Sequence, residues 1–341
     1  MSKPTVIVIL GMHRSGTSVL CELISHLGGK LVDGLIPVID AINSHGFFED
    51  AEVVRINELL LMGLNRTWFD LRPLPSDWLS KVSPDIFSCA KRHVDEHYLS
   101  QDTSLLKDPR LCLLMPFWSK VFEQSGVEVK LVYGYRNPGQ VAASLNARDA
   151  IPIDSGFILW LNYTLGSFSS ISHEQTFFAV NYADLLSDSI TETHRIANFL
   201  DINDEGIVGG SAFGTIIDSS QQRFKTNSLT SYSLPSMTQY LDITIENIET
   251  GINNEISTLA DSWLSWHEEN EEWIITVNEH LQKVVSINKD LHQLGEDFKH
   301  AQEIVALRDQ QLKECNQQLM ERDTTLLGRI NRNLIYRKNV E

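Results

Sequence analysis

The chain has 341 residues, of which 42% are hydrophobic, so it can build one large core and an accessory segment. Its formal net charge of −17 excludes a general nucleic-acid binder, although a local pocket can still attract an anion. The four cysteines lack metal-ligand spacing and are typical of reduced, buried thiols, so we expect a cytoplasmic protein without a metal. No apolar run approaches the ~18 residues that span a bilayer, so we expect no transmembrane segment.

The first strong signal is the apolar, mostly β-branched run 6–10, which predicts a buried parallel strand. It leads into a short loop that contains Gly11 and Gly16. Apolar residues after the loop recur at the spacing of a helix face, namely Val19, Leu20, Leu23, Ile24 and Leu27. A strand, a glycine turn and a helix start form a phosphate site, because free N–H groups and the helix dipole favour an anion there.

The side chains of this loop add further donors. Ser15, Thr17 and Ser18 supply hydroxyl groups, and Arg14 supplies a fixed positive charge. The spacing G-x-x-x-x-G resembles the nucleotide-triphosphate P-loop, in which Lys follows the second glycine. Thr17 stands at that position here, and the cation is Arg14, inside the loop. The alternative is an ordinary glycine turn of an α/β protein.

The segment after the first helix is less regular. Residues 28–45 predict an irregular connection, which leads into Gly46-Phe47-Phe48-Glu49-Asp50. Apolar periodicity predicts a helix over 52–64, and two prolines and two tryptophans predict a packed loop over 68–79.

Three more strand-to-helix junctions follow, at 104–110, 130–138 and 177–182. The pairs Asp108-Pro109 and Asn137-Pro138 predict a helix cap followed by the first helical residue. The helices after the first and third of these junctions are expected to end near 124 and 200.

Four strands, each followed by a helix, predict a parallel sheet with right-handed crossovers. The fold class is therefore α/β, with a P-loop-type three-layer α/β/α arrangement. Arg14, Lys107, Arg136 and Tyr182 follow the ends of the four strands. Since open α/β sheets bind ligands at that edge, three cations there predict an anion site.

A second anion contact is predicted from Arg136 and Ser144, which are eight residues apart. Arg136 ends a strand and Ser144 lies about two turns into the next helix, so both could contact one phosphate. The alternative is a surface ion pair of Arg136 and an incidental small residue at 144.

Three segments of the chain resemble the sulfotransferases that use 3′-phosphoadenosine 5′-phosphosulfate (PAPS). His13-Arg14-Ser15-Gly16-Thr17-Ser18 is similar to the 5′-phosphosulfate loop, and Arg136-Asn137-Pro138 with Ser144 to the 3′-phosphate motif. Tyr182-Ala183-Asp184-Leu185-Leu186 resembles the family's Tyr-Glu-Asp-Leu segment, whose Tyr sits near the adenine. The resemblance covers residues 1 to about 235.

The resemblance is to the bacterial carbohydrate-type branch, through Gly46-Phe47-Phe48-Glu49-Asp50 and Leu106-Lys107-Asp108-Pro109-Arg110. It implies sulfuryl transfer to a hydroxyl or amine of a glycan or glycoconjugate acceptor by in-line displacement. Two departures from the cytosolic small-molecule enzymes stand out. The loop cation is Arg14 rather than Lys, as in many carbohydrate sulfotransferases, and no His occupies an obvious base position. His13 belongs to the cofactor loop, but we expect it to be structural.

The resemblance also implies catalytic roles. Arg14 would stabilise the charge that develops on the leaving phosphate, helped by the N–H groups of 16–18. Glu49 is the first choice for the base and Asp50 the second. The alternative for Glu49 is a solvated carboxylate or a helix-cap neighbour. Nearby Arg14 and Lys107 would lower the pKa of Glu49 and make it a poorer base, unless burial offsets the effect.

Further basic residues fit the same implied reaction. Lys107, taken as catalytic, and Arg110 could bind sulfate or an anionic acceptor. The alternative is a local ion pair of Asp108 with Arg110. Arg223 and Lys225 fall where the family often has a late basic loop near the 3′-phosphate.

From residue 236 the strand–helix alternation stops. We expect a sulfotransferase-like domain over 1–235, a helical linker over 236–280, a coiled coil over 281–327 and a polar tail over 328–341. Trp263, Trp266 and Trp273 in the linker are expected to pack against the enzyme domain or a partner helix.

The coiled coil is predicted from heptads, in which one seam position holds Val284, Leu291, Phe298, Val305, Leu312, Leu319 and Leu326. The other holds Ile287, Leu294, Ala301, Arg308, Cys315 and Arg322. This pattern predicts a homo-oligomer, and a solvated single helix is the alternative. For the whole protein, the alternatives to a sulfotransferase are a P-loop small-molecule kinase and a non-catalytic coiled-coil assembly protein with a degenerate nucleotide domain.

Overall fold

The computed structural model describes residues 3–37, 46–170, 177–204, 235–250 and 253–338. Its centre is a four-stranded sheet in the order β2-β1-β3-β4, in which every neighbouring pair is parallel. The strands are β1 (Thr5–Leu10), β2 (Thr103–Lys107), β3 (Glu128–Tyr135) and β4 (Phe177–Asn181). The four predicted strands are all present.

The register of the sheet aligns the carboxyl ends of the strands. Ile9 pairs with Lys107, and Tyr135 pairs with Asn181. The segments that follow β1, β2, β3 and β4 therefore leave the sheet at the same edge, as the sequence predicted.

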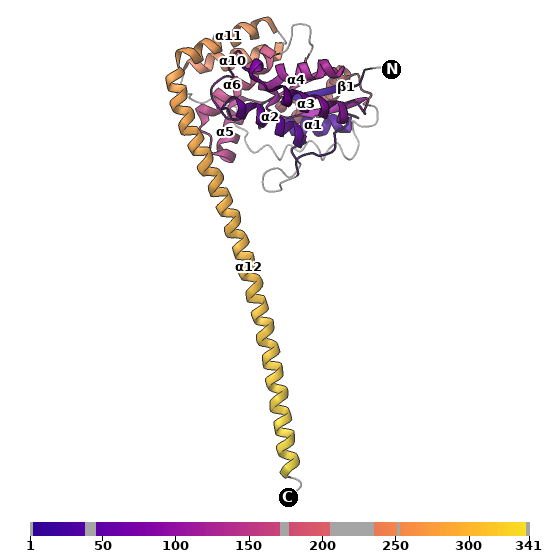
Figure 1. Cartoon of the computed structure of the whole chain (residues 1–341), viewed down its shortest axis with the longest axis vertical. Helices are drawn as coiled ribbons and strands as arrows, with labels where there is room; N and C mark the ends of the chain where they lie inside the picture. The colour runs from indigo at the N-terminus through magenta and orange to yellow at the C-terminus, as the bar shows by residue number, and fades with distance from the viewer. Residues whose placement is uncertain (1–2, 38–45, 171–176, 205–234, 251–252, 339–341) are drawn as a thin grey trace. The chain divides into compact units, whose positions relative to one another are not determined.

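Helices cover both faces of this sheet (Figure 1). The helices of the described residues are α1 (Thr17–His26), α2 (Ala51–Gly63), α3 (Pro84–His97), α4 (Leu111–Ser125), α5 (Pro138–Asp149), α6 (Ile153–Ser170), α7 (Tyr182–Ser187), α8 (Ser189–Leu200), α10 (Pro235–Thr250), α11 (Asn253–Glu269) and α12 (Glu271–Lys338), with a 3₁₀ turn, η1, at Trp78–Lys81.

The alternation of side chains along β1 creates two separate cores. Ile7 and Ile9 pack with residues of α1 and α8, whereas Val6 and Val8 pack with the larger set from α2 to α6, α10 and α11. Successive side chains of a strand point to opposite faces, so a strand buried on both faces needs a continuous apolar run. The three-layer α/β/α prediction is confirmed.

One predicted helix start was wrong. Helix α4 begins at Leu111 rather than Pro109, and its N-cap residue is Arg110, whose side chain makes no capping bond. The Asp108 carboxylate accepts hydrogen bonds from Arg110 N at 2.9 Å and from Asn57 Nδ2 at 3.0 Å, so it closes the turn that precedes the helix. Tyr182 directly follows β4 as expected, but the single helix expected to run to about 200 is divided into α7 and α8.

Helices α10 and α11 and the first part of α12 pack onto the same core as the sheet. The chain divides into two compact units, residues 1–285 and 286–341. Helix α11 lies against α6, where the buried Trp263 Nε1 donates to Asn162 Oδ1 at 2.8 Å. The Trp263 ring also stacks on Trp266, with 4.6 Å between ring centroids. This packing is the role expected for Trp263 and Trp266, whereas Trp273 is 40% exposed. The domain boundaries at 235, 280 and 327 stay predictions.

His267 makes this packing sensitive to pH. It is buried, hydrogen-bonded to Asn162 Oδ1 at 3.0 Å, and burial lowers its pKa to about 4. The folded state then binds fewer protons than the unfolded chain, in which the pKa of His is ~6.5. The contribution of neutral His267 to the free energy of unfolding is therefore fully present above about pH 6.5, and it is lost as the pH drops toward about 4. Urea unfolding at pH 7 and pH 5 should show a loss of ~2 kcal/mol in wild type that a His267→Gln variant lacks. An equal loss in both proteins would contradict this assignment.

The second unit is a continuation of the single helix α12 (Figure 1). Among the described residues, no helix is both long enough and apolar enough to cross a bilayer.

Candidate functional site

The loop between β1 and α1 is held close to the sheet by its two glycines. Gly11 has φ +143°, and a Cβ there would lie 2.3 Å from the carbonyl oxygen of Gly134 on β3. Gly16 has φ +86°, and a Cβ there would lie 2.2 Å from the Tyr182 ring. Both positions therefore require glycine.

The start of α1 is arranged as an anion site. Gly16 is the N-cap residue, and no side chain caps the helix there. The N–H groups of the first turn of a helix have no partner within the helix. The Ser15 hydroxyl is buried and has no hydrogen-bond partner among the described residues. Because a buried hydroxyl without a partner is costly, the loop fits a bound oxyanion that supplies one.

A Gly16→Ala substitution tests the close approach of the loop to Tyr182. We expect it to lower the free energy of unfolding by ~1–3 kcal/mol, through the strained φ and the displaced ring. Gly28→Ala is the control, because Gly28 has φ +112° but no atom within 4 Å of the added Cβ. Chemical denaturation of both variants separates the two effects. Equal losses would show that the contact with Tyr182 contributes nothing.

The two predicted phosphate segments meet in space. Arg14 Nε donates to the Ser144 hydroxyl at 2.8 Å, across 130 residues of sequence. Arg136 Nη1 donates to the Arg14 carbonyl oxygen at 3.3 Å, and its guanidinium lies 4.9 Å from the centre of the Tyr182 ring. Arg136 and Ser144 are both buried, so the alternative of a surface arginine and an incidental serine is wrong.

Gln140 is a member of this cluster that the sequence analysis missed. Its Oε1 accepts from Arg136 Nε at 2.8 Å. Gln140 lies one helical turn before Ser144 on α5, a spacing that places both on one helix face. The sequence could have indicated Gln140 through this spacing of four residues from Ser144. The Gln140 amide orients the guanidinium, and burial lowers the pKa of Arg136, as expected for a cation removed from water.

Glu49 and Lys107 form a buried ion pair beside the start of α1. Lys107 Nζ donates to Glu49 Oε1 at 2.7 Å and to the Phe47 carbonyl oxygen at 2.9 Å. It also lies 3.4 Å from the Ser18 hydroxyl, in the first turn of α1. The structure therefore brings Lys107 into contact with the predicted phosphosulfate loop and pairs it with Glu49, the predicted base.

Burial decides the ionisation of Glu49. Desolvation raises the pKa of Glu49, and nearby Asp108 adds to the rise, while Lys107 lowers it. The net shift is upward, so burial offsets the effect of the cations. A carboxylate with a raised pKa is a better proton acceptor near neutral pH. Glu49 is 7% exposed, so it is not a solvated carboxylate, but it directly precedes Asp50, the N-cap residue of α2, and is therefore the helix-cap neighbour of the alternative interpretation.

Asp50 has a structural position. Its Oδ1 accepts from the N–H of Glu52 at 2.9 Å, so it caps α2. Its Oδ2 accepts from the Tyr98 hydroxyl at 2.8 Å and lies 2.6 Å from His93 Nε2. Burial alone would raise the pKa of Asp50, but these hydrogen bonds outweigh it and lower the pKa. Asp50 is therefore less suited than Glu49 to take a proton.

His13 is half-buried next to the loop. Its ring packs against Trp68, with 4.4 Å between ring centroids. Burial, and then the charges of Arg110 and other nearby cations, hold the pKa of His13 well below its usual value. A neutral, packed imidazole agrees with the expected structural role.

Arg110 and the late basic residues complete the predicted set. Arg110 Nη1 lies 3.0 Å from Asp108 Oδ1, and its Nε donates to Glu58 Oε1 at 2.6 Å. The local ion pair that was the alternative for Arg110 is thus present. Arg223 and Lys225 lie outside the described residues.

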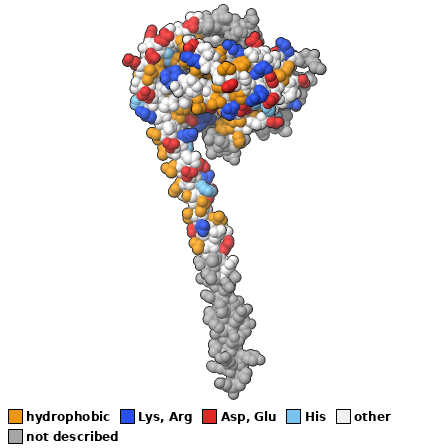
Figure 2. Space-filling view, viewed as in Figure 1, with side chains coloured by type: hydrophobic (Ala, Val, Ile, Leu, Met, Phe, Trp, Pro, Cys, Tyr) orange, Lys and Arg blue, Asp and Glu red, His pale blue; other side chains and the backbone are white. Residues whose placement is uncertain are grey.

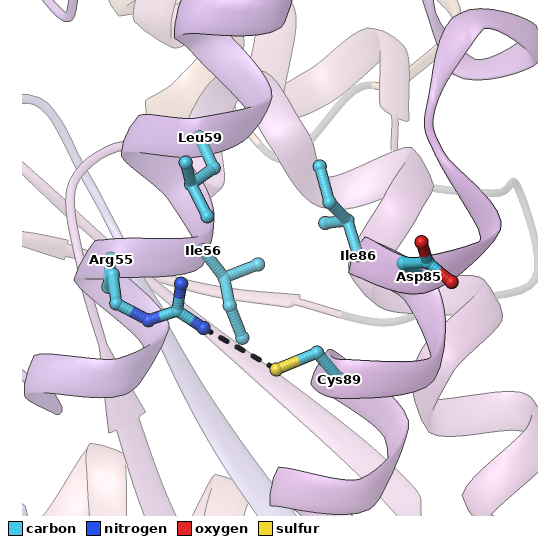
Figure 3. A pocket seen from close by; sticks show the side chains of 6 residues that line it. All are labelled: Arg55, Ile56, Leu59, Asp85, Ile86 and Cys89. Carbon is cyan, nitrogen blue, oxygen red and sulfur yellow. Dashed lines mark hydrogen bonds between the residues drawn. The ribbon is translucent and has the colours of Figure 1, made fainter.

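A separate pocket of about 200 Å³ lies between α2 and α3 (Figure 3). Arg55 Nη2 donates to Cys89 Sγ there at 3.4 Å, but the same guanidinium is paired with Glu52 at 2.6 Å. The pocket contains none of the predicted site residues. Its lining is Arg55, Ile56, Leu59, Asp85, Ile86 and Cys89. Across the described part of the chain, no group of three or more His, Cys, Asp or Glu residues is arranged to hold a metal ion.

No protein family model and no curated protein matches the chain. Its structure is similar to the sulfotransferase domain of the Synechococcus olefin synthase, at 19% identity and a TM-score of 0.44, over 73% of this chain and 95% of that one. It is also similar to the sulfotransferase domain from the curacin biosynthetic pathway, at 17% identity and a TM-score of 0.41, over 72% and 99% of the two chains.

A third similar structure is the sulfotransferase STF9 from Mycobacterium avium, at 14% identity and a TM-score of 0.42, over 73% and 77% of the two chains.

Proposed function

We propose that the chain is a sulfotransferase that transfers a sulfuryl group from PAPS to a hydroxyl or amine of an acceptor. The observation that carries this proposal is the cluster in which Arg14 contacts Ser144 and Arg136 contacts Arg14. It joins a phosphate loop at the start of α1 to a second set of anion donors beside an aromatic ring. A donor with separate 5′- and 3′-phosphate groups requires such a pair of anion positions.

The described residues fit this donor. The N–H groups of the first turn of α1, the Ser15 hydroxyl and Arg14 would hold its 5′-phosphosulfate, because the hydroxyl otherwise has no partner. Arg136 and Ser144 would hold its 3′-phosphate. Tyr182 would lie near its adenine, and Thr17 and Ser18 would add hydroxyl groups in the loop.

Bound PAPS supplies an activated sulfuryl group on a phosphate leaving group. The chain's own residues would do the rest. Arg14 would stabilise negative charge at the bridging oxygen, and Lys107 would hold Glu49 beside the loop. Glu49 would accept the proton of the attacking hydroxyl or amine. We propose a glycan as acceptor on the resemblance of segments 46–50 and 106–110 to the carbohydrate-type branch.

Calorimetry with 3′-phosphoadenosine 5′-phosphate (PAP) and with ATP–magnesium tests the donor. We expect PAP to bind and ATP–magnesium to bind far more weakly. Binding of ATP–magnesium without binding of PAP would replace the proposal by a P-loop kinase. Binding of neither would leave the assembly protein with a degenerate nucleotide domain.

The acceptor needs a separate measurement. Incubation with PAPS and a set of oligosaccharides, followed by mass spectrometry, should show sulfated products. Transfer only to non-glycan acceptors would keep the sulfotransferase proposal and remove the glycan.

A further inference from the structure

The second unit exposes a stripe of apolar side chains along α12. Leu294 is 65% exposed and Phe298 is 64% exposed, far more than such side chains are in a core. Figure 2 shows hydrophobic side chains recurring along the described part of this helix. The stripe follows the heptad seam through Ile287, Leu291, Leu294, Phe298, Ala301, Val305, Arg308 and Leu312.

The sizes of these side chains match when the seam is paired with itself in the opposite direction. The seam has two positions per heptad, one that includes Leu291 and Phe298 and one that includes Leu294 and Ala301. In an antiparallel pair, residues at the first of these positions pack against residues at the second position of the other helix. A two-fold axis between residues 299 and 300 places the largest side chain, Phe298, opposite the smallest, Ala301. It also pairs Leu294 with Val305 and Ile287 with Leu312. In a parallel pair in register, Phe298 would face Phe298 and Ala301 would face Ala301, which packs large and small layers unevenly.

The charges favour the same direction. In a parallel pair, Arg308 of one copy would face Arg308 of the other in the same layer, so two like charges would meet across the seam, with Asp309 as the carboxylate beside them. In the antiparallel pair, Arg308 lies opposite Leu291, and the residue beside Leu291 is Asp290. The guanidinium can reach this carboxylate at the rim of the seam. Each copy contributes one such pair.

We propose that α12 forms an antiparallel two-stranded coiled coil with α12 of a second copy of this chain over residues 287–312. The paired segment would be ~38 Å long, at about 1.5 Å per residue. It covers more than three heptads, which is the length that sustains a coiled coil. The inference does not depend on the proposed chemistry of the nucleotide site.

Disulfide cross-linking of the full chain reads the direction of the pair. The background carries Cys89→Ser and Cys315→Ser. In the antiparallel pair the two copies of position 294 lie ~16 Å apart along the axis, so Leu294→Cys alone should not cross-link under a mild oxidant. Val305→Cys alone should not cross-link either. The double variant Leu294→Cys with Val305→Cys should give a covalent dimer, because the two positions face each other.

A charge exchange tests the ion pair independently. Asp290→Arg and Arg308→Asp should each raise the dissociation constant of the dimer roughly tenfold, because two pairs become like-charge contacts. The double exchange should restore the dimer, which no parallel arrangement predicts. Sedimentation velocity measures the dimer, and circular dichroism with thermal unfolding checks that each variant is folded.

Three results would overturn the inference. If the full chain is a monomer in solution, a second copy does not cover the apolar stripe. Cross-linking of either single-cysteine variant shows a parallel pair. A persistent dimer that the double-cysteine variant fails to cross-link shows a different register.

Discussion

Replacing Glu49 by Gln is expected to lower kcat by about 10²- to 10⁴-fold, the usual contribution of a positioned general base. The substitution keeps the shape of the side chain and can still accept a hydrogen bond from Lys107, which now lies at 2.7 Å. PAP affinity should therefore change little. Because burial raises the pKa of Glu49, wild-type activity should fall on acidification at a higher pH than an ordinary carboxyl would give. The variant should lack this acidic limb.

Glu192→Gln is the matched control for this experiment. Glu192 is also a buried carboxylate in an ion pair, with Arg195, but it lies on α8 and outside the site. Its variant should keep kcat and the pH profile. A Glu49→Gln enzyme that retains the wild-type kcat would leave the Glu49–Lys107 pair with a structural role only.

Replacing Arg136 by Lys is expected to cost about 10- to 100-fold in PAP affinity, the value of hydrogen bonds to a charged group. Lys keeps the positive charge but loses the planar fork and the contact with the Tyr182 ring, 4.9 Å away. Adenosine 5′-monophosphate, which lacks the 3′-phosphate, isolates the effect. Calorimetry should show a preference for PAP over this nucleotide in wild type and little preference in the variant.

Arg195→Lys serves as the control, since Arg195 also lies over an aromatic ring, with 5.2 Å to the centre of Phe178. It should bind both nucleotides as wild type does. If Arg136→Lys lost affinity equally for both nucleotides, Arg136 would not bind the 3′-phosphate. Its role would then be to hold the conformation of the loop through its hydrogen bond to the Arg14 carbonyl oxygen.

The sheet was predictable because its strands carry unmistakable apolar runs. Two helices were not predicted, α3 (Pro84–His97) and α6 (Ile153–Ser170). Helix α3 has a signal that was overlooked, because Ser83 caps it and Pro84 is its first residue. Helix α6 is buried for most of its length, so it lacks the polar face that gives a surface helix its period.

The site was predictable where function depends on local sequence. The loop at 13–18 and the spacing of Arg136 and Ser144 placed those residues at one edge of the sheet. The ionisation of Glu49 was not predictable, because its pKa depends on how deeply the fold buries it. The predicted start of α4 was wrong for a related reason. Asp108 accepts from Arg110 N in a turn that precedes the helix, and its second oxygen is held by Asn57, 51 residues away in sequence, a contact that no local pattern gives.

The hydrogen bonds of Asn162 bear on where the polypeptide can be shortened. Its Nδ2 donates to the Leu71 carbonyl at 2.8 Å, and its Oδ1 accepts from both Trp263 and His267. A fragment that stops at residue 235 would lose both donors and uncover the apolar surface of α6, which predicts aggregation during expression. A fragment that stops at residue 285 keeps the whole network and omits the exposed stripe of α12. The shorter crystallisable form of this protein should therefore end near 285 rather than where the sulfotransferase-like motifs end.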